Sequence, residues 1–190
     1  RLQNCIREVT TNLNKYELGV ASDLATDFVW GDFCDWYIEL AKSRLQSEGE
    51  SAQNARQVLV WVVSKILLLL HPFMPFITEE IWQSLPHEGE TIMTQAYPGY
   101  DEALNFPEAS HEMEMVMEAI KAIRNRRAEM NVPPSRKAKV YIAAKEQKPY
   151  VNGEKFIIKL ASANEVEIGE SFELEGAVTI VTADRKSTRL

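Results

Sequence analysis

The chain has 190 residues with a formal net charge of −7, and 45% of its residues are hydrophobic. This length allows one or two domains with a sizeable core, while the acidic balance argues against a uniformly basic nucleic-acid-binding protein and leaves room for a local basic patch. Cys5 and Cys34 are the only cysteines and show no CxxC spacing, so we expect neither a zinc site nor a disulfide framework.

The first residues already follow a helical pattern, without an initiating methionine or a signal peptide. We therefore expect a piece of a longer cytoplasmic protein. Apolar residues at helical spacing predict a helix over about residues 1–13, and a turn over 12–15 leads into a long helix from Glu17 to about Leu45. Gly31 lies in the middle of that helix, where glycine costs roughly 1 kcal/mol against alanine, and is expected to mark a kink or a close approach. The polar residues 46–53 predict a loop.

The most apolar stretch runs from Val58 to Leu70 and is broken only by Ser64 and Lys65. It is shorter than the roughly 20 residues that cross a bilayer, so it predicts the central helix of a bundle, buried on every side. Pro72 is expected to end this helix, and Pro75 to open the next one at its first position, where the missing N–H costs nothing.

An irregular connection is predicted over residues 87–106, with a short extended piece at 91–94. Pro107 fits the first turn of a last long helix, which Pro133 and Pro134 end. The pattern then changes to strands over 140–143, 166–168 and 177–181 and a helix over 151–160. Residues 185–190 continue none of these patterns, which leaves open whether they belong to the native fold.

Two stretches carry a family resemblance: HPFMPFITEEIW, residues 71–82, and FCDWYIE, residues 33–39. They are similar to the helical anticodon-binding domain of class I aminoacyl-tRNA synthetases, and most similar to the valyl-tRNA synthetase family. The resemblance covers essentially the whole chain but only a late part of a much longer enzyme. It implies a mainly α fold, with an antiparallel helical bundle over 1–134 and a small α/β subdomain over 135–190, truncated before a coiled-coil arm.

The resemblance also implies the partners of such a fragment. They are the anticodon arm of tRNA(Val) and the catalytic domain of the same polypeptide, which ligates valine to its tRNA with ATP. The HIGH and KMSKS motifs of that catalytic domain do not occur in this chain, nor do HExxH, GxSxG or P-loop patterns. We therefore expect no catalytic residue, metal site or cofactor in the fragment itself.

A basic segment is the main candidate for RNA contact. Between Lys121 and Lys139, seven lysines and arginines face one acid, Glu129. Arg124 and Arg127 share a helix face, with Lys121 one turn before them, and Lys137 follows beyond the helix. Since the planar guanidinium suits both phosphates and stacked bases, we predict that both arginines are exposed and bind RNA. The alternative is a solvated helix end whose cations only favour the helix dipole.

Four aromatic residues within the long helix form a second candidate set: Trp30, Phe33, Trp36 and Tyr37. At α-helical spacing, Trp30 and Tyr37 follow the core stripe while Phe33 and Trp36 point elsewhere. Unstacked anticodon bases are often stacked on aromatic rings, which makes Phe33 the preferred stacking candidate. Packing in the core or between helices is the competing interpretation for each ring.

Two further features complete the candidates. Lys15, in the turn before the long helix, is a modest candidate for phosphate contact. Asp35 and Glu39 share a helix face, but Lys42 and Arg44 are close in sequence, so a structural ion pair is expected rather than a catalytic dyad.

Two alternatives to the valyl family remain open. One is the isoleucyl or leucyl family, which shares the bundle. The other is a helical protein-interaction module without RNA binding. A salt titration separates RNA contact from an apolar protein interface, because only phosphate contacts make affinity fall steeply with salt.

Overall fold

The computed structural model describes residues 1–173, 178–181 and 187–189. The chain divides into two compact units, Arg1–Asn105 and Phe106–Leu190. This division differs from the predicted boundary at residues 134 and 135, because the last long helix packs on the helix of the small sheet and so belongs to the second unit. Over the part of the chain that the structure describes, no helix is both long and apolar enough to cross a membrane.

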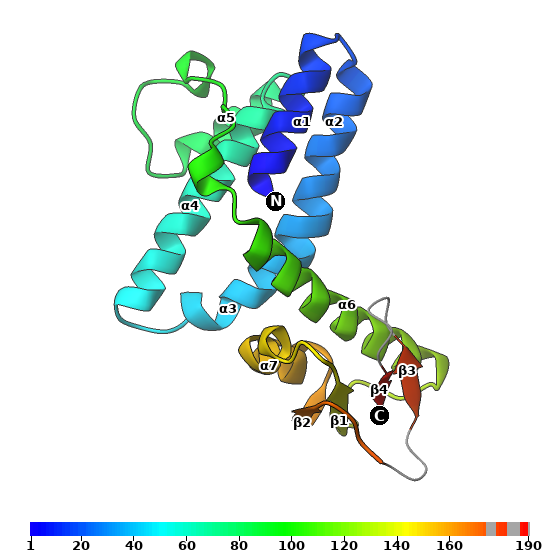
Figure 1. Ribbon diagram of the computed structural model, residues 1–190. Helices are drawn as coiled ribbons and strands as arrows, with labels where there is room; N and C mark the ends of the chain where they lie inside the picture. Colours follow the sequence, from blue (N-terminus) through cyan, green and yellow to red (C-terminus); the bar gives the residue numbers. More distant parts are fainter. Residues whose placement is uncertain (174–177, 182–186, 190) are drawn as a thin grey trace. The chain divides into compact units, whose positions relative to one another are not determined.

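The first unit is a helical bundle, as predicted. Its elements are α1 (Leu2–Asn14), α2 (Leu18–Asp27), the π-helical segment η1 (Phe28–Ile38), α3 (Glu39–Leu45), α4 (Glu50–Leu70) and α5 (Pro75–Gln83). Helices α1 and α2 form an antiparallel hairpin, against which α4 packs (Figure 1). Their contact surface is built from apolar residues at helical spacing, among them Ile6, Val9 and Leu69, which are at most 1% exposed.

The long helix predicted over residues 17–45 forms without a break, but its middle is π-helical. In this geometry the backbone bonds join residues five apart rather than four, so the buried face advances by an extra residue. Gly31 lies inside the segment, and a Cβ added there would meet nothing within 4 Å. The glycine therefore marks the irregular turn and serves no close approach.

The apolar stretch 58–70 of α4 is buried only in its last turns. Ile66–Leu70 are buried, whereas Val58 is 50% and Trp61 40% exposed, so the prediction of burial along the whole stretch is wrong for its first half. The reason is that neighbours cover only one side of the first half of this stretch, where Leu59 and Val62 pack on the core while Val58 and Trp61 face away from it. Leu69 faces the core formed with α1 and α2, and Leu68 faces a second cluster with Trp82 of α5. Helix α4 also starts at Glu50, inside the predicted loop.

The proline corner forms as predicted, with α4 ending at Leu70 and Pro75 at the first position of α5. The buried Thr78 hydroxyl donates to the Met74 carbonyl at 2.8 Å and lies 2.7 Å from Nδ1 of His71. These bonds tie the first turn of α5 to the end of α4.

Glu79 of α5 binds the start of the irregular connection that follows this helix. Its carboxylate accepts from the Thr91 hydroxyl at 2.7 Å and from the Ile92 backbone N–H at 3.1 Å. The segment Ile92–Thr94 is a 3₁₀ turn, η2, rather than the extended piece predicted there, because the Thr91 hydroxyl accepts from the backbone N–H of Met93 and closes the turn.

The end of the first unit returns to its first helix. The side-chain oxygen of Gln3 accepts from the Asp101 backbone N–H at 2.8 Å, and the Arg7 guanidinium lies 5.1 Å from the centre of the Tyr100 ring. A last short turn, η3 (Glu102–Leu104), closes the unit.

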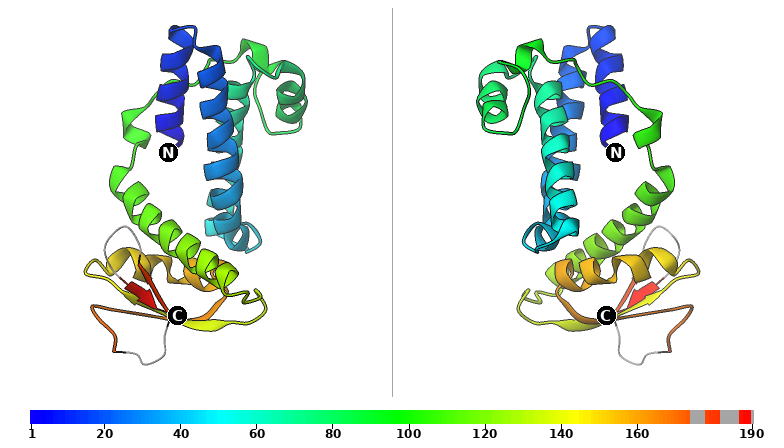
Figure 2. Two further views of the ribbon diagram at one scale, coloured as in Figure 1. Left: turned by 90° about the vertical axis from the view of Figure 1, so that its right-hand side faces the viewer. Right: turned by 90° about the vertical axis from the view of Figure 1, so that its left-hand side faces the viewer.

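The second unit combines a long helix with a small sheet. Helix α6 (Pro107–Glu129) is followed by β1 (Ala138–Ala143), α7 (Lys148–Leu160), β2 (Ala163–Gly169), β3 (Thr179–Val181) and β4 (Ser187–Arg189). The strand order is β2-β1-β4-β3. Strands β1 and β2 are parallel with α7 as their connection, whereas β4 pairs antiparallel with both β1 and β3. Figure 2 shows α6 and α7 from two sides.

The helices and strands predicted for this unit are confirmed, with shifted ends. Pro107 opens α6, and α7 starts at Lys148 rather than at 151. The strand predicted over 177–181 is present as Thr179–Val181, while residue 177 lies outside the described residues. Residues 187–189, which matched no sequence pattern, form the strand β4.

Candidate nucleic-acid interface

The basic segment occupies the last turns of α6 and the turn that leads to β1. Lys121 and Arg124 are exposed on the helix, and Arg136 and Lys137 are exposed in the turn. Several of the seven cations are held by groups of the protein itself. Arg126 forms an ion pair with Glu129 at 2.9 Å, and Arg127 and Lys139 have the partners described below.

Arg127 is 6% exposed, so the prediction that it lies on the exposed side of the helix is wrong. Its Nη2 donates to the Pro133 carbonyl at 3.1 Å and to the carbonyl of Arg136. After α6 the chain turns back through Asn131, whose φ is 53°, and the carbonyls of this turn need a donor. The guanidinium supplies it, and Arg127 is thus a structural residue of the turn.

Lys139 is held by the neighbouring strand. Its ammonium pairs with Glu165 at 3.2 Å and with Glu167. The hydrogen bond to Glu167 is the main cause that raises the pKa of Lys139 above its ordinary value. This lysine is neutralised within the sheet.

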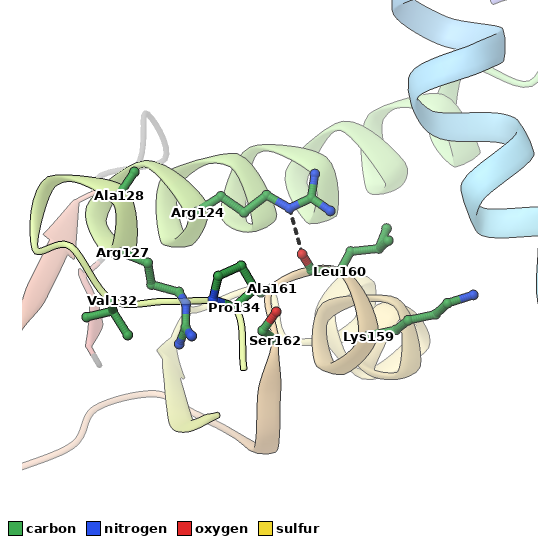
Figure 3. A pocket seen from close by; sticks show the side chains of 9 residues that line it. All are labelled: Arg124, Arg127, Ala128, Val132, Pro134, Lys159, Leu160, Ala161 and Ser162. Carbon is green, nitrogen blue, oxygen red and sulfur yellow. Dashed lines mark hydrogen bonds between the residues drawn. The ribbon is translucent and has the colours of Figure 1, made fainter. Parts of the chain in front are cut away.

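Arg124 is exposed, and its Nε donates to the Leu160 carbonyl at 2.6 Å. That carbonyl belongs to the last turn of α7, where backbone oxygens lack helical partners and a cation is favourable. Figure 3 shows the two terminal nitrogens of Arg124 directed away from this carbonyl. Among the described residues, Arg124 forms no ion pair with a carboxylate. Its charge is therefore available while its orientation is fixed.

A pocket of about 530 Å³ opens between the ends of α6 and α7. Its lining comprises Arg124, Arg127, Ala128, Val132, Pro134, Lys159, Leu160, Ala161 and Ser162 (Figure 3). The sequence prediction missed Lys159 and Ser162. They lie on a segment far from the basic cluster in sequence, and only the crossover through α7 brings them beside it.

The aromatic set of the first unit is buried differently from the prediction. Phe33 is 8% exposed and stacks on Tyr37 with ring centres 5.7 Å apart, and Trp36 is 7% exposed. Phe33 is therefore a core residue, and its assignment as a stacking residue for RNA is wrong. Because the segment is π-helical, the side chains that face the core differ from those that α-helical spacing predicts. Trp30, expected in the core, is therefore 65% exposed.

The other candidates of the first unit serve mainly the fold. Lys15 is exposed in the turn after α1. Glu39 forms an ion pair with Lys42, which confirms the structural interpretation of that carboxylate. The His87 ring packs at a tilt against Trp82 with ring centres 3.9 Å apart, and His71 bonds to Thr78 at the proline corner. Among the described residues, no group of three His, Cys, Asp or Glu residues could hold a metal ion.

Comparison with known proteins gives one family and a set of close relatives. Residues 1–142 match the family described as the anticodon-binding domain of tRNA ligase. The chain is 51% identical to a valine–tRNA ligase of Clostridium perfringens over 87% of its length and 19% of the relative. It is 50% identical to that of Clostridium tetani and 40% identical to that of Staphylococcus saprophyticus, in each case over 96% of this chain and 21% of the relative. The chain thus spans about a fifth of the length of these relatives.

Proposed function

Because the chain belongs to the family of anticodon-binding domains of tRNA ligases, we propose that it is the part of a valine–tRNA ligase that binds the anticodon arm of tRNA(Val). The relatives named above, at 40–51% identity, support valine over isoleucine or leucine as the amino acid of the whole enzyme. The ligation of valine to tRNA with ATP would take place in a catalytic domain of the same polypeptide, in the cytoplasm.

The observation that carries the RNA-binding proposal is the distribution of charge in the second unit. A chain of net charge −7 exposes Lys121, Arg124, Arg136 and Lys137 around the end of one helix. RNA affinity comes largely from neutralised phosphates, and Arg124 offers a fixed fork of donors that fits a phosphate or the face of a base. Lys15 remains a weaker candidate for phosphate contact in the first unit.

Salt dependence of tRNA binding tests this proposal. The affinity for tRNA(Val) is measured over a range of salt concentrations for the native chain and for Arg124→Ala and Lys137→Ala. Each substitution is expected to shrink the slope of log affinity against log salt by roughly 0.7–0.9 for each phosphate that the variant no longer neutralises. Lys42→Ala is the matched control, since this lysine is paired with Glu39. Equal slopes for all four proteins would contradict the proposal and favour a protein-interaction module.

The chain by itself should not activate valine. Without the catalytic domain, we expect no valine-dependent exchange of pyrophosphate into ATP. An exchange rate above that of a blank reaction, measured with the purified chain, would contradict this expectation.

A further inference from the structure

The pocket between the ends of α6 and α7 combines cationic side chains with an apolar surface. We propose that it holds one unpaired nucleotide of RNA, with the base against its apolar floor and the phosphate against Arg124 and Lys159. The inference rests on the proposed function and makes it more specific. Four of the nine lining residues, Lys159 to Ser162, lie beyond residue 142, where the match to the anticodon-binding family ends.

The floor of the pocket suits the face of a base. Five of its lining residues carry no polar side-chain atom: Ala128, Val132, Pro134, Leu160 and Ala161. The volume of about 530 Å³ lies within the range of about 300–1,000 Å³ that is usual for sites of small organic ligands. A bare phosphate would leave this apolar surface uncovered, whereas an unstacked base would bury it.

The rim of the pocket suits the phosphate of the same nucleotide. Lys159 is exposed on the last turn of α7, and Arg124 approaches from α6 (Figure 3). The bond from Arg124 Nε to the Leu160 carbonyl, 2.6 Å long, orients the guanidinium before any ligand arrives. Because none of the residues that line the pocket is acidic, nothing in the lining opposes an anion.

Two parts of the pocket are held in place by the fold: the wall near Pro134 and the backbone at Ser162. Arg127, nine-tenths buried, holds the wall formed by Pro134 and its neighbours through its bonds to the Pro133 and Arg136 carbonyls. Ser162 adopts a φ of 53°, a left-handed conformation that costs free energy in a non-glycine residue. That conformation brings the Ser162 hydroxyl to the pocket, where a nucleotide offers several hydrogen-bonding groups.

Paired RNA does not fit this geometry. In a duplex the bases are stacked and their faces are covered, so only the phosphates of a duplex could reach Arg124 and Lys159. The pocket therefore predicts a preference for RNA with an unpaired loop, beyond the electrostatic attraction that any RNA would feel.

The test fills the pocket without changing its charge. Ala128 is exposed on α6, and Ala128→Phe places a ring in the cavity. Asn125→Phe, at an exposed residue of the same helix outside the lining, is the matched control. Fluorescence anisotropy measures binding of two RNAs: the anticodon-arm hairpin of tRNA(Val) and the same strand fully paired to its complement. Free nucleoside monophosphate is added as a competitor.

We expect Ala128→Phe to lower the affinity for the hairpin by about tenfold or more, because stacking of one base is lost, and to leave duplex affinity and the salt slope unchanged. Asn125→Phe should change neither. Circular dichroism checks folding. If Ala128→Phe does not fold, the hairpin affinity of Lys159→Ala tests the inference instead. Lys155→Ala is its control, because this lysine is exposed on the same helix but lies outside the lining.

The outcomes separate this inference from the function it rests on. Equal affinity of the native chain for hairpin and duplex, or an unchanged hairpin affinity in Ala128→Phe and Lys159→Ala, would overturn the nucleotide pocket and leave anticodon-arm binding standing. Binding of neither RNA would overturn the proposed function as well. Displacement of the hairpin by free nucleoside monophosphate at a concentration equal to that of the RNA would make this a site for free nucleotides and also overturn the inference.

Discussion

Phe28 and Phe33 lie five residues apart on η1, and both rings enter the same core, at 9% and 8% exposure. Five residues is the spacing of the π-helical hydrogen bond. An α-helix would turn the second ring well away from the first, but the wider turn of η1 returns it to the core beside Tyr37. The π segment thus allows one helix to bury both rings on one side while exposing Trp30.

The first prediction compares two rings of this segment. Phe33→Ala is expected to lower the free energy of unfolding by about 3–5 kcal/mol, because it leaves a cavity in a buried core. Trp30→Ala, at a residue that is 65% exposed, should change it by at most about 0.5 kcal/mol. Urea unfolding followed by circular dichroism measures both. A larger loss for Trp30→Ala than for Phe33→Ala would refute the π-helical register.

The second prediction compares two helical glycines. A Cβ at Gly153 of α7 would lie 2.6 Å and 2.9 Å from the methyl groups of Val116, which is 2% exposed and cannot move aside. Gly153→Ala should therefore cost about 1–3 kcal/mol through overpacking. At Gly31 a Cβ meets nothing within 4 Å, so Gly31→Ala should stabilise the helix by about 0.5–1 kcal/mol. The midpoint temperatures of thermal unfolding of the two variants should shift in opposite directions relative to the native chain. Shifts of the same sign would count against the packing of α6 on α7.

The third prediction concerns the acid dependence of stability. Hydrogen bonds from Gln83 and Thr91, and from the Ile92 N–H, lower the pKa of Glu79 below its ordinary value of 4.5. Since the folded pKa is the lower one, the ionised carboxylate stabilises the fold above the ordinary pKa, and this contribution is lost as the pH falls through the folded pKa.

Glu79→Gln tests this relation. The variant should be less stable than the native chain at neutral pH, and the difference should shrink as the pH falls from 4.5 through the lower folded pKa of Glu79. Glu80→Gln, on the same helix at an exposed residue, is the control. Urea unfolding over a series of pH values measures the difference, and a gap that grows toward acid pH would rule out the assigned bonds.

The fourth prediction separates the two arginines of α6. Arg127→Ala leaves the Pro133 and Arg136 carbonyls of the turn without their donor, and should lower the free energy of unfolding by about 1–3 kcal/mol. Its salt slope for tRNA binding should equal that of the native chain at temperatures where the variant is folded. Arg124→Ala should reduce that slope instead. If Arg127→Ala reduced the slope and left stability unchanged, the assignment of these roles would be reversed.

How far prediction from the sequence reaches can be seen at single residues. Pro75 and Pro107 correctly indicate the first turns of α5 and α6, because a proline constrains its own backbone regardless of its neighbours. The π segment has no such local signal, and without it the helical spacing assigns Phe33 and Trp30 to exchanged faces. Burial also depends on neighbours, which is why Val58 and Trp61 are exposed despite the apolar stretch around them.

The candidate site was predicted in part for the same reason. The density of cations at the end of α6 is local, so the sequence indicates the region. The bond of Arg127 to the turn and the approach of Lys159 and Ser162 depend on how β1, α7 and β2 return the chain to α6. No pattern within a helix or a strand could indicate those contacts.

The return of the first unit to its own first helix has a consequence for how this unit could be re-engineered. Gln3 binds the backbone of Asp101, and Arg7 covers the ring of Tyr100, so the two ends of this unit meet at one place. A unit whose ends meet can be exchanged between homologous chains, or reconnected in a permuted order, with a short linker and little disturbance of either partner. The bundle thus has the end geometry that tolerates insertion into another chain.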